Sequence, residues 1–202
     1  MTRNVEEVVT AHRQLEGGGF VVRRPFPTGG LDLVDPFLLL DEMGPADYAP
    51  GEAVGAPDHP HRGFETVTYM GEALGVRAVI DTHTPIVYQD WTLFPGAVVE
   101  QPIPEGHNAL VYVFEGGAAV GRAETPLADG QLGRLGAGGS VRLAVPANAP
   151  AGARLLLLAG QPLGEPVARY GPFVMNTEAE IRRAFLDFRS GSLGEIRARL
   201  TD

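Results

Sequence analysis

The sequence contains no cysteine and no lysine, and serine occurs only at Ser140, Ser190 and Ser192. Without cysteine the chain has no disulfide, no thiolate nucleophile and no sulfur ligand for a metal. Without lysine it has no amine for a Schiff base and cannot form a Walker-type phosphate loop. None of the serines lies in a G-x-S-x-G nucleophile elbow. These absences leave few candidates for covalent catalysis.

Long apolar runs and positive charge are also scarce. The longest apolar run, at 155–160, is far shorter than the roughly 20 residues that cross a bilayer. The net charge of -9 over 202 residues disfavours direct nucleic-acid binding, because phosphate contacts need a basic surface. The first residues are acidic where a secretory signal would be apolar. We therefore expect a cytoplasmic chain that binds proteins or small molecules, with no membrane contact.

The arrangement of glycine and proline indicates an all-β fold. The 27 glycines and 17 prolines separate short β-rich segments and are not gathered into one linker. This spacing is typical of a sandwich or barrel, whereas a parallel α/β sheet would need helical crossovers between strands. The expected strands are 19–24, 36–41, 64–70, 75–81, 86–94, 97–101, 108–114, 117–122, 140–145 and 153–159.

One amphipathic helix is expected near the C-terminus, in the stretch NTEAEIRRAFLDFRSGSLG. Asn176 or Thr177 provides an N-cap, acidic residues occupy the first turn, and Arg189 lies in the last turn. Gly191 is the expected stop signal. A second, weaker helix is expected at 191–201.

The chain has one plausible internal boundary, at GEALG (71–75). A proline-rich, loop-heavy section precedes it and a denser series of strands follows, so we divide the chain into segments 1–72 and 73–202. The opening residues VEEVVTAHRQ (5–14) fit either a short helix or a strand.

The stretch DHPHRGFETVTY (58–69) suggests a metal site. In a strand, His59 and His61 would project from one face, about 6 to 7 Å apart, and could chelate one ion. Glu65 has the same parity. Two imidazoles and a carboxylate suit Fe, Mn, Ni, Cu or Zn, and form the ligand set of non-haem Fe(II) oxygenases. The alternative is that both histidines are surface residues or hydrogen-bonded core residues.

The same stretch carries a family resemblance. The sequence resembles the pirin family of the cupin superfamily over nearly its whole length, and DHPHRGFETV is quite specific to pirins. The resemblance rests on DPFLLLDEM (35–43), PDHPHRGFETVTY (57–69), GEALGV (71–76), FPGAVVEQPIPEGHNALVYVFEG (94–116) and GPFVMNTEAEIRRAFLDFRSG (171–191).

The resemblance implies two cupin barrels with one metal, usually iron, in the N-terminal one. Two of its four ligands match His59 and His61. The others, a histidine and a glutamate in an H-x-E pattern, follow later in the family, but this sequence contains no H-x-E, and Met70 leads directly into GEALG. We therefore expect a cupin jelly-roll fold with a truncated N-terminal half (1–72) and a full C-terminal barrel plus helix (73–202). The expected metal ligands are His59, His61 and Glu65.

Two functions follow from the resemblance. The first is a pirin-like protein that binds iron or another divalent metal with weak or no catalysis, and acts as a regulatory module toward a protein partner. The alternative is an iron-dependent quercetin 2,3-dioxygenase acting on a small aromatic substrate, which needs three or four protein ligands on the metal. A structural protein without metal is a third interpretation.

A shortened barrel also has a physical consequence. It leaves strand edges unpaired and an apolar face uncovered, which proteins relieve by covering or pairing them. Two chains could pair through the shortened halves and bring His59 and His61 of both subunits together at a two-fold axis. Alternatively, the C-terminal barrel covers the N-terminal strands within one chain.

Overall fold

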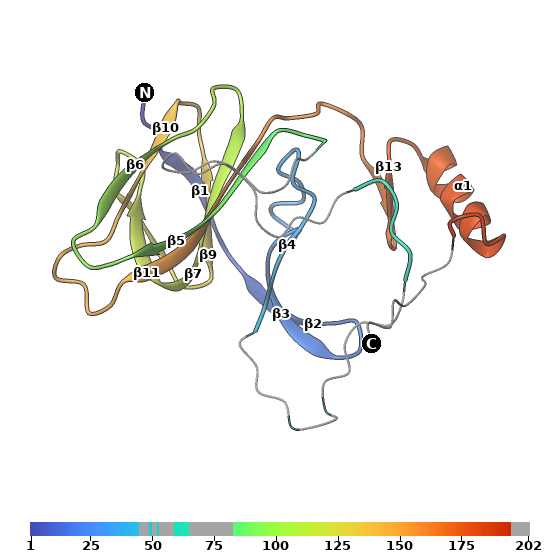
Figure 1. The fold of residues 1–202 in the computed structure, drawn as a ribbon, viewed down its shortest axis with the longest axis horizontal. Coiled ribbons are helices and arrows are strands. Elements are labelled where there is room, and N and C mark those ends of the chain that lie inside the picture. The colour runs from blue at the N-terminus through green and yellow to red at the C-terminus, as the bar shows by residue number, and fades with distance from the viewer. Residues whose placement is uncertain (45–48, 50–51, 53–58, 65–82, 195–202) are drawn as a thin grey trace, which may run out of the picture. The chain divides into compact units, whose positions relative to one another are not determined.

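The structure is a computed structural model that describes residues 1–44, 49, 52, 59–64 and 83–194. Its described residues form antiparallel strands and one α-helix, which confirms the expected all-β class (Figure 1). Among them, no helix has the length and apolar character needed to span a membrane. The expected boundary at 71–75 and the expected strand at 75–81 lie outside the described residues.

The chain divides into two compact units. The first joins Met1–Gly55 to Thr68–Leu163, and the second joins Ala56–Val67 to Gly164–Asp202. The histidine-bearing segment therefore belongs to the same unit as the C-terminal helix. His61 contacts Pro172 of this unit although 111 positions separate the two residues in the sequence.

The first unit contains a jelly-roll barrel built around one long strand. The strand β7 (Asn108–Val120) pairs with β11 and β9 along its first half, and with β8 and β10 along its second half. Figure 1 shows β5, β11, β7 and β9 in succession. The other strands are β1 (Val5–Thr10), β5 (Ile86–Leu93), β6 (Val98–Pro102), β8 (Thr125–Ala128), β9 (Gln131–Leu135), β10 (Ser140–Ala144) and β11 (Ala153–Gly160).

A glycine marks the point where β7 passes from one sheet to the other. Gly116 has φ 73, and a Cβ added there would lie 2.1 Å from the carbonyl oxygen of Gly152. Only glycine tolerates both the left-handed backbone and so close an approach. Gly116 therefore lies where β7 changes its partners, from β11 and β9 to β8 and β10.

Alternation along β7 buries both of its faces. Val111 and Val113 face the barrel interior and pack with Leu155 and Leu157 in an entirely apolar cluster. Tyr112, on the opposite face, packs against residues that lie in sequence between β1 and β5. Those residues are Phe26, Leu31 and Val34. Burial of one such aliphatic side chain contributes about 1.5 to 3 kcal/mol, so the N-terminal residues are part of the core of this unit.

A buried arginine fixes the start of the chain to the barrel. Arg3 is 2% exposed and donates hydrogen bonds of 2.8 to 3.2 Å to four carbonyl oxygens. These belong to Pro104, His107, Gly136 and Gly138. Burial lowers the pKa of the Arg3 guanidinium. The carbonyl oxygens compensate for the lost hydration of the cation, because a buried charge needs a full set of hydrogen bonds.

A small sheet lies in sequence between the barrel strands β1 and β5. It contains β2 (His12–Glu16), β3 (Phe20–Phe26) and β4 (Leu40–Met43), paired in that order. Glu42 of β4 accepts hydrogen bonds from the Arg23 guanidinium and from the Tyr112 hydroxyl, so charged groups connect this sheet to the outer face of β7. Burial and the adjacent Glu42 carboxylate raise the pKa of Tyr112, which keeps the phenol protonated.

The second unit contains a short hairpin and the helix besides the histidine-bearing segment. The strands β12 (Ala168–Tyr170) and β13 (Phe173–Met175) pair with each other, and α1 (Glu178–Arg189) packs beside β13 (Figure 1). Phe173, Ile181 and Ala184 form its buried core. Thr177, one of the two expected N-caps, caps α1, and Glu180 completes a capping box with it.

The end of α1 also agrees with the sequence. Gly191 has φ 73 and donates its N–H to the carbonyl of Phe188, while Ser192 donates to the carbonyl of Asp187. This pair of bonds is a Schellman motif, in which glycine occupies the left-handed position. Residues 191–193 form a turn, and the remainder of the expected second helix (191–201) lies outside the described residues from 195 onward.

Candidate metal centre

His59 and His61 lie on an irregular, exposed segment and not in a strand. Their rings nonetheless meet edge to face, with centroids 4.4 Å apart. Two imidazoles bound at right angles to one ion, with metal–nitrogen bonds of about 2.1 Å, place their ring centres about 4.5 Å apart. The strand geometry expected for the pair is wrong; the rings instead make an edge-to-face contact, whose spacing is compatible with two neighbouring ligands on one ion.

The ring of His61 contacts Pro172, which belongs to the same unit and directly precedes β13. Its Nδ1 lies 3.4 Å from the carbonyl oxygen of Pro172, a long contact in which only the ring nitrogen can donate. A proton on Nδ1 leaves Nε2 with a free lone pair, which is the form of imidazole that binds metals. Phe64 covers one side of the same ring, with centroids 4.9 Å apart.

The backbone after His61 is attached to β13. Arg62 and Phe173 form a parallel bridge, and the N–H of Val174 donates to the carbonyl of Arg62 at 3.1 Å. Gly63 has φ 92, and a Cβ added there would lie 1.6 Å from the Val174 carbonyl oxygen. Glycine is therefore required where this segment passes β13.

The side chain of Arg62 reaches the C-terminal helix. Its Nη1 lies 2.8 Å from Oδ2 of Asp187, whose side chain is 17% exposed. Arg62 and Arg183 hold the pKa of the Asp187 carboxyl below its usual value, with the hydrogen bond from Arg62 as the largest cause.

The third predicted ligand, Glu65, lies outside the described residues. Across the described ranges, no group of three or more His, Asp or Glu side chains is arranged to hold a metal ion. The site described therefore offers an ion two imidazoles, which fits part of the coordination that the resemblance implies. Whether Glu65 joins the pair stays a prediction.

The interior of the C-terminal barrel offers no comparable site among the described residues, because apolar side chains fill it. Where a metal-binding cupin would carry His-x-His, this chain has His107 and Ala109. Ala109 is buried in the core, and Nδ1 of His107 is buried without a hydrogen-bond partner. Burial, and next the charge of Arg3, lower the pKa of His107. His107 is therefore a neutral packing residue.

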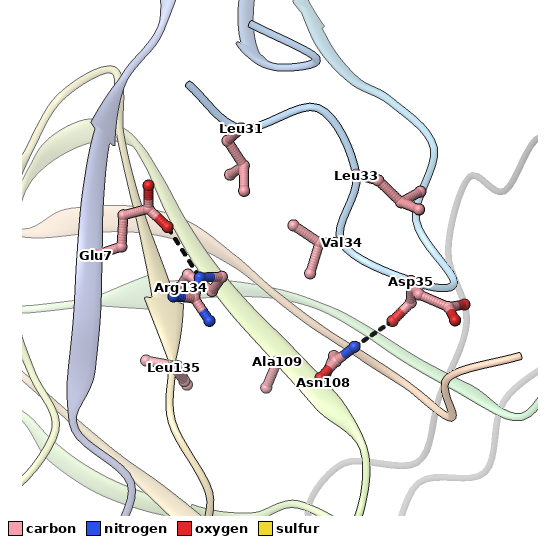
Figure 2. A pocket seen from close by; sticks show the side chains of 9 residues that line it. All are labelled: Glu7, Leu31, Leu33, Val34, Asp35, Asn108, Ala109, Arg134 and Leu135. Carbon is pink, nitrogen blue, oxygen red and sulfur yellow. Dashed lines mark hydrogen bonds and ion pairs between the residues drawn. The ribbon is translucent and has the colours of Figure 1, made fainter. Parts of the chain in front are cut away.

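A pocket of about 450 Å³ lies elsewhere in the first unit. Leu31, Leu33 and Val34 lie on one side, and Glu7 and Arg134 lie across from them on β1 and β9 (Figure 2). The Arg134 guanidinium binds Glu7 at 2.9 Å and Glu6 at 3.3 Å, so its charge is already compensated. The pocket can offer apolar contacts and hydrogen bonds to a small molecule, but it has no cation available for an anion.

Sequence reasoning missed the residues that hold the histidine segment. Pro172 and Asp187 contact it from positions far along the chain, and neither carries a local signal for such a contact. Asp187 was identifiable only as the acidic partner of Arg183 one helical turn earlier, a spacing typical of surface ion pairs.

Comparisons with known proteins agree with this architecture. The pirin C-terminal cupin domain matches residues 88–194, and the pirin domain that precedes it matches residues 19–75. A pirin-like protein of Solanum lycopersicum is 31% identical, with 98% of this chain and 95% of the tomato protein covered. Human pirin is 30% identical, with coverage of 98% and 96% respectively.

The comparisons also support the shortened N-terminal half. The alignment with the tomato protein extends over 285 positions, so that protein contains residues with no counterpart in this 202-residue chain.

The crystal structure of a quercetin 2,3-dioxygenase from Acinetobacter baumannii has the same fold, with a TM-score of 0.81 at 23% identity, covering 98% of this chain and 100% of that one. This chain belongs to the pirin family, with a full C-terminal cupin domain and an N-terminal half that lacks its later part.

Proposed function

We propose that this pirin-family chain binds a divalent metal ion, iron by family analogy, through His59 and His61, with Glu65 as the third ligand and with weak or no catalysis. The observation that carries the proposal is the 4.4 Å spacing of the two imidazole rings. The contact of His61 Nδ1 with Pro172 supports it, because that contact leaves Nε2 as the ligating atom.

Weak catalysis follows from the donor set. An ion held by two imidazoles and one carboxylate has several positions open to water, so the protein orients a substrate on it less strictly than a four-ligand site does. When bound, the ion would supply Lewis acidity and redox chemistry at this exposed position. His59 and His61 would bind it as neutral ligands, so acid should release it.

Metal binding is testable on protein purified without a histidine tag. We expect close to one equivalent of Fe²⁺ per chain after anaerobic loading, and a large loss of affinity in His59→Ala and His61→Ala. His12→Ala is the matched control, because His12 is also exposed but lies on β2 of the other unit. If the wild-type protein retains no iron, or if His12→Ala loses as much as His61→Ala, the proposed site is wrong.

The second candidate function is a quercetin 2,3-dioxygenase acting on a small aromatic substrate. It is favoured by the fold shared with the Acinetobacter baumannii enzyme. Anaerobically iron-loaded protein mixed with quercetin and oxygen separates the two functions. We expect at most slow turnover, and turnover that is fast and abolished in His61→Ala would replace the first proposal by the second.

The alternative to this single-chain site is an ion shared with a protein partner, and a second copy of the chain is one such partner. Pairing through the shortened N-terminal halves would bring four imidazoles together at a two-fold axis, which would complete the coordination. Light scattering at micromolar concentration tests this arrangement. A monodisperse monomer that binds one metal ion per chain would exclude it.

A further inference from the structure

Three successive residues of the histidine segment contact three successive residues of the C-terminal hairpin. His61 contacts Pro172 through its ring, Arg62 bridges to Phe173 through the backbone, and Gly63 passes so close to Val174 that no side chain fits between them. The segment has no strand structure of its own at His59–His61. The described hydrogen bonds of this segment, to Pro172 and to Val174 of β13, therefore set the direction in which the histidines project.

A side-chain contact reinforces this backbone attachment. Arg62 donates to Asp187 at 2.8 Å, and both side chains are largely shielded, at 31% and 17% exposed. Arg183 also binds Asp187 at 2.8 Å, but its own side chain is 75% exposed. Asp187 therefore receives one cation from the histidine segment and one from solvent-facing helix surface.

The position of Asp187 is itself fixed. Ile181 and Ala184 of α1 pack with Phe173 of β13, which holds the helix against the strand that the histidine segment contacts. The carbonyl of Asp187 accepts from Ser192 in the Schellman motif that ends the helix. A carboxylate so placed is a rigid anchor, because little backbone entropy remains to be lost when it binds Arg62.

We infer that Asp187 is a positioning residue for the metal site: through Arg62 it holds the His59–His61 segment on β13, so that the helix α1 sets the affinity of the histidine pair for metal. The inference rests on the proposed metal-binding function. It assigns a role to the helix α1, which follows the whole C-terminal barrel in sequence. Groups that orient the ligands of a metal site typically change its affinity 10- to 100-fold when removed, so we expect about a tenfold effect here.

The test uses full-length protein without a histidine tag, titrated with Co²⁺ and followed by the absorption of the bound ion. Asp187→Asn keeps the size of the side chain and removes its charge, and we expect it to weaken Co²⁺ binding about tenfold. Arg62→Met should have the same effect while leaving α1 unaltered. The exchanged pair Arg62→Asp with Asp187→Arg should recover part of the lost affinity, which a nonspecific loss of stability would not do.

Arg183→Gln is the matched control. It removes the other cation bound to Asp187 but leaves Arg62 in place, so the Co²⁺ affinity should stay unchanged. If Asp187→Asn and Arg62→Met both bind Co²⁺ as tightly as the wild-type protein, the inference is wrong. It is equally wrong if Arg183→Gln weakens binding as much as Asp187→Asn.

A second measurement separates this inference from the proposed function. In metal-free protein, nuclear Overhauser contacts between the His61 and Phe64 rings, whose centroids are 4.9 Å apart, report on how the segment is held. We expect these contacts to weaken in Asp187→Asn and to persist in Arg183→Gln. If the wild-type protein binds no metal while the ring contacts still depend on Asp187, the metal function fails and the positioning role stands. Ring contacts that are unchanged in Asp187→Asn overturn the positioning role.

Discussion

Replacement of Arg3 by methionine should destabilise the barrel far more than a substitution near a chain terminus normally does. The methionine side chain has a similar length but cannot donate, so four carbonyl oxygens lose the hydrogen bond from Arg3, and that of Pro104 keeps only the N–H of His107. A buried polar group left without a partner costs about 1 to 3 kcal/mol. Part of this cost is recovered, because a buried cation no longer has to be desolvated and water can reach some of the carbonyls.

The net loss should therefore be about 3 to 5 kcal/mol. In a chain of 202 residues each kcal/mol lowers the melting temperature by about 2 to 4 °C, so we expect a fall of about 6 to 20 °C. Differential scanning calorimetry measures it, with Arg13→Met on exposed β2 as the control. A fall of only one or two degrees in Arg3→Met would show that the four hydrogen bonds contribute little, and would refute the reasoning.

Three further predictions concern other sites. The pKa of His107 is lowered in the folded state, so the unfolded chain binds a proton at this residue more readily. The contribution of His107 to stability should therefore be full above about pH 6.5 and fall as the pH drops below that value. Calorimetry should find this loss of stability reduced in His107→Phe. Tyr112→Phe removes a hydrogen bond to the Glu42 carboxylate and should cost about 1.5 to 3 kcal/mol in urea unfolding, whereas exposed Tyr170→Phe should cost nothing. Gly63→Ala should accelerate hydrogen exchange of the Val174 amide, and unaltered exchange would show that the segment does not depend on this close approach.

Local signals predicted the elements that carry them. The N-cap Thr177 and Gly191 define the two ends of α1; the sequence predicted Gly191 and offered Thr177 as one of two possible N-caps. The strands β5, β10 and β11 are bounded by turn residues and lie within a residue or so of their expected positions. In each case the information is contained within a few neighbouring residues, which is why it could be read without a structure.

Other strands gave weaker signals. The residues of β1 alternate between partly buried and exposed, but the two adjacent glutamates and the three valines also fit a helix, and only pairing with β9 selects the strand. The strands β8 and β9 were not expected, because Pro126 interrupts the apolar pattern of β8 and Gly133 interrupts that of β9. Tertiary pairing decides such segments, since β propensity depends strongly on context.

The candidate site likewise has one feature that the sequence indicated and one that it did not. The residue types at His59 and His61 pointed to a metal from the sequence alone, because imidazoles two positions apart are a recognisable ligand pattern. The geometry of the pair was beyond that reasoning, because Pro172 and Asp187 act on it from distant positions. A contact across such a distance leaves no pattern in a single sequence.

The most direct test of the account is X-ray absorption at the iron edge of anaerobically loaded protein, with the His59→Ala, His61→Ala double variant measured beside it. We predict scattering from two imidazoles per iron in the wild-type chain, with the rest of the coordination from oxygen, and loss of both imidazoles in the variant. An iron environment that is identical in the two proteins would contradict the account.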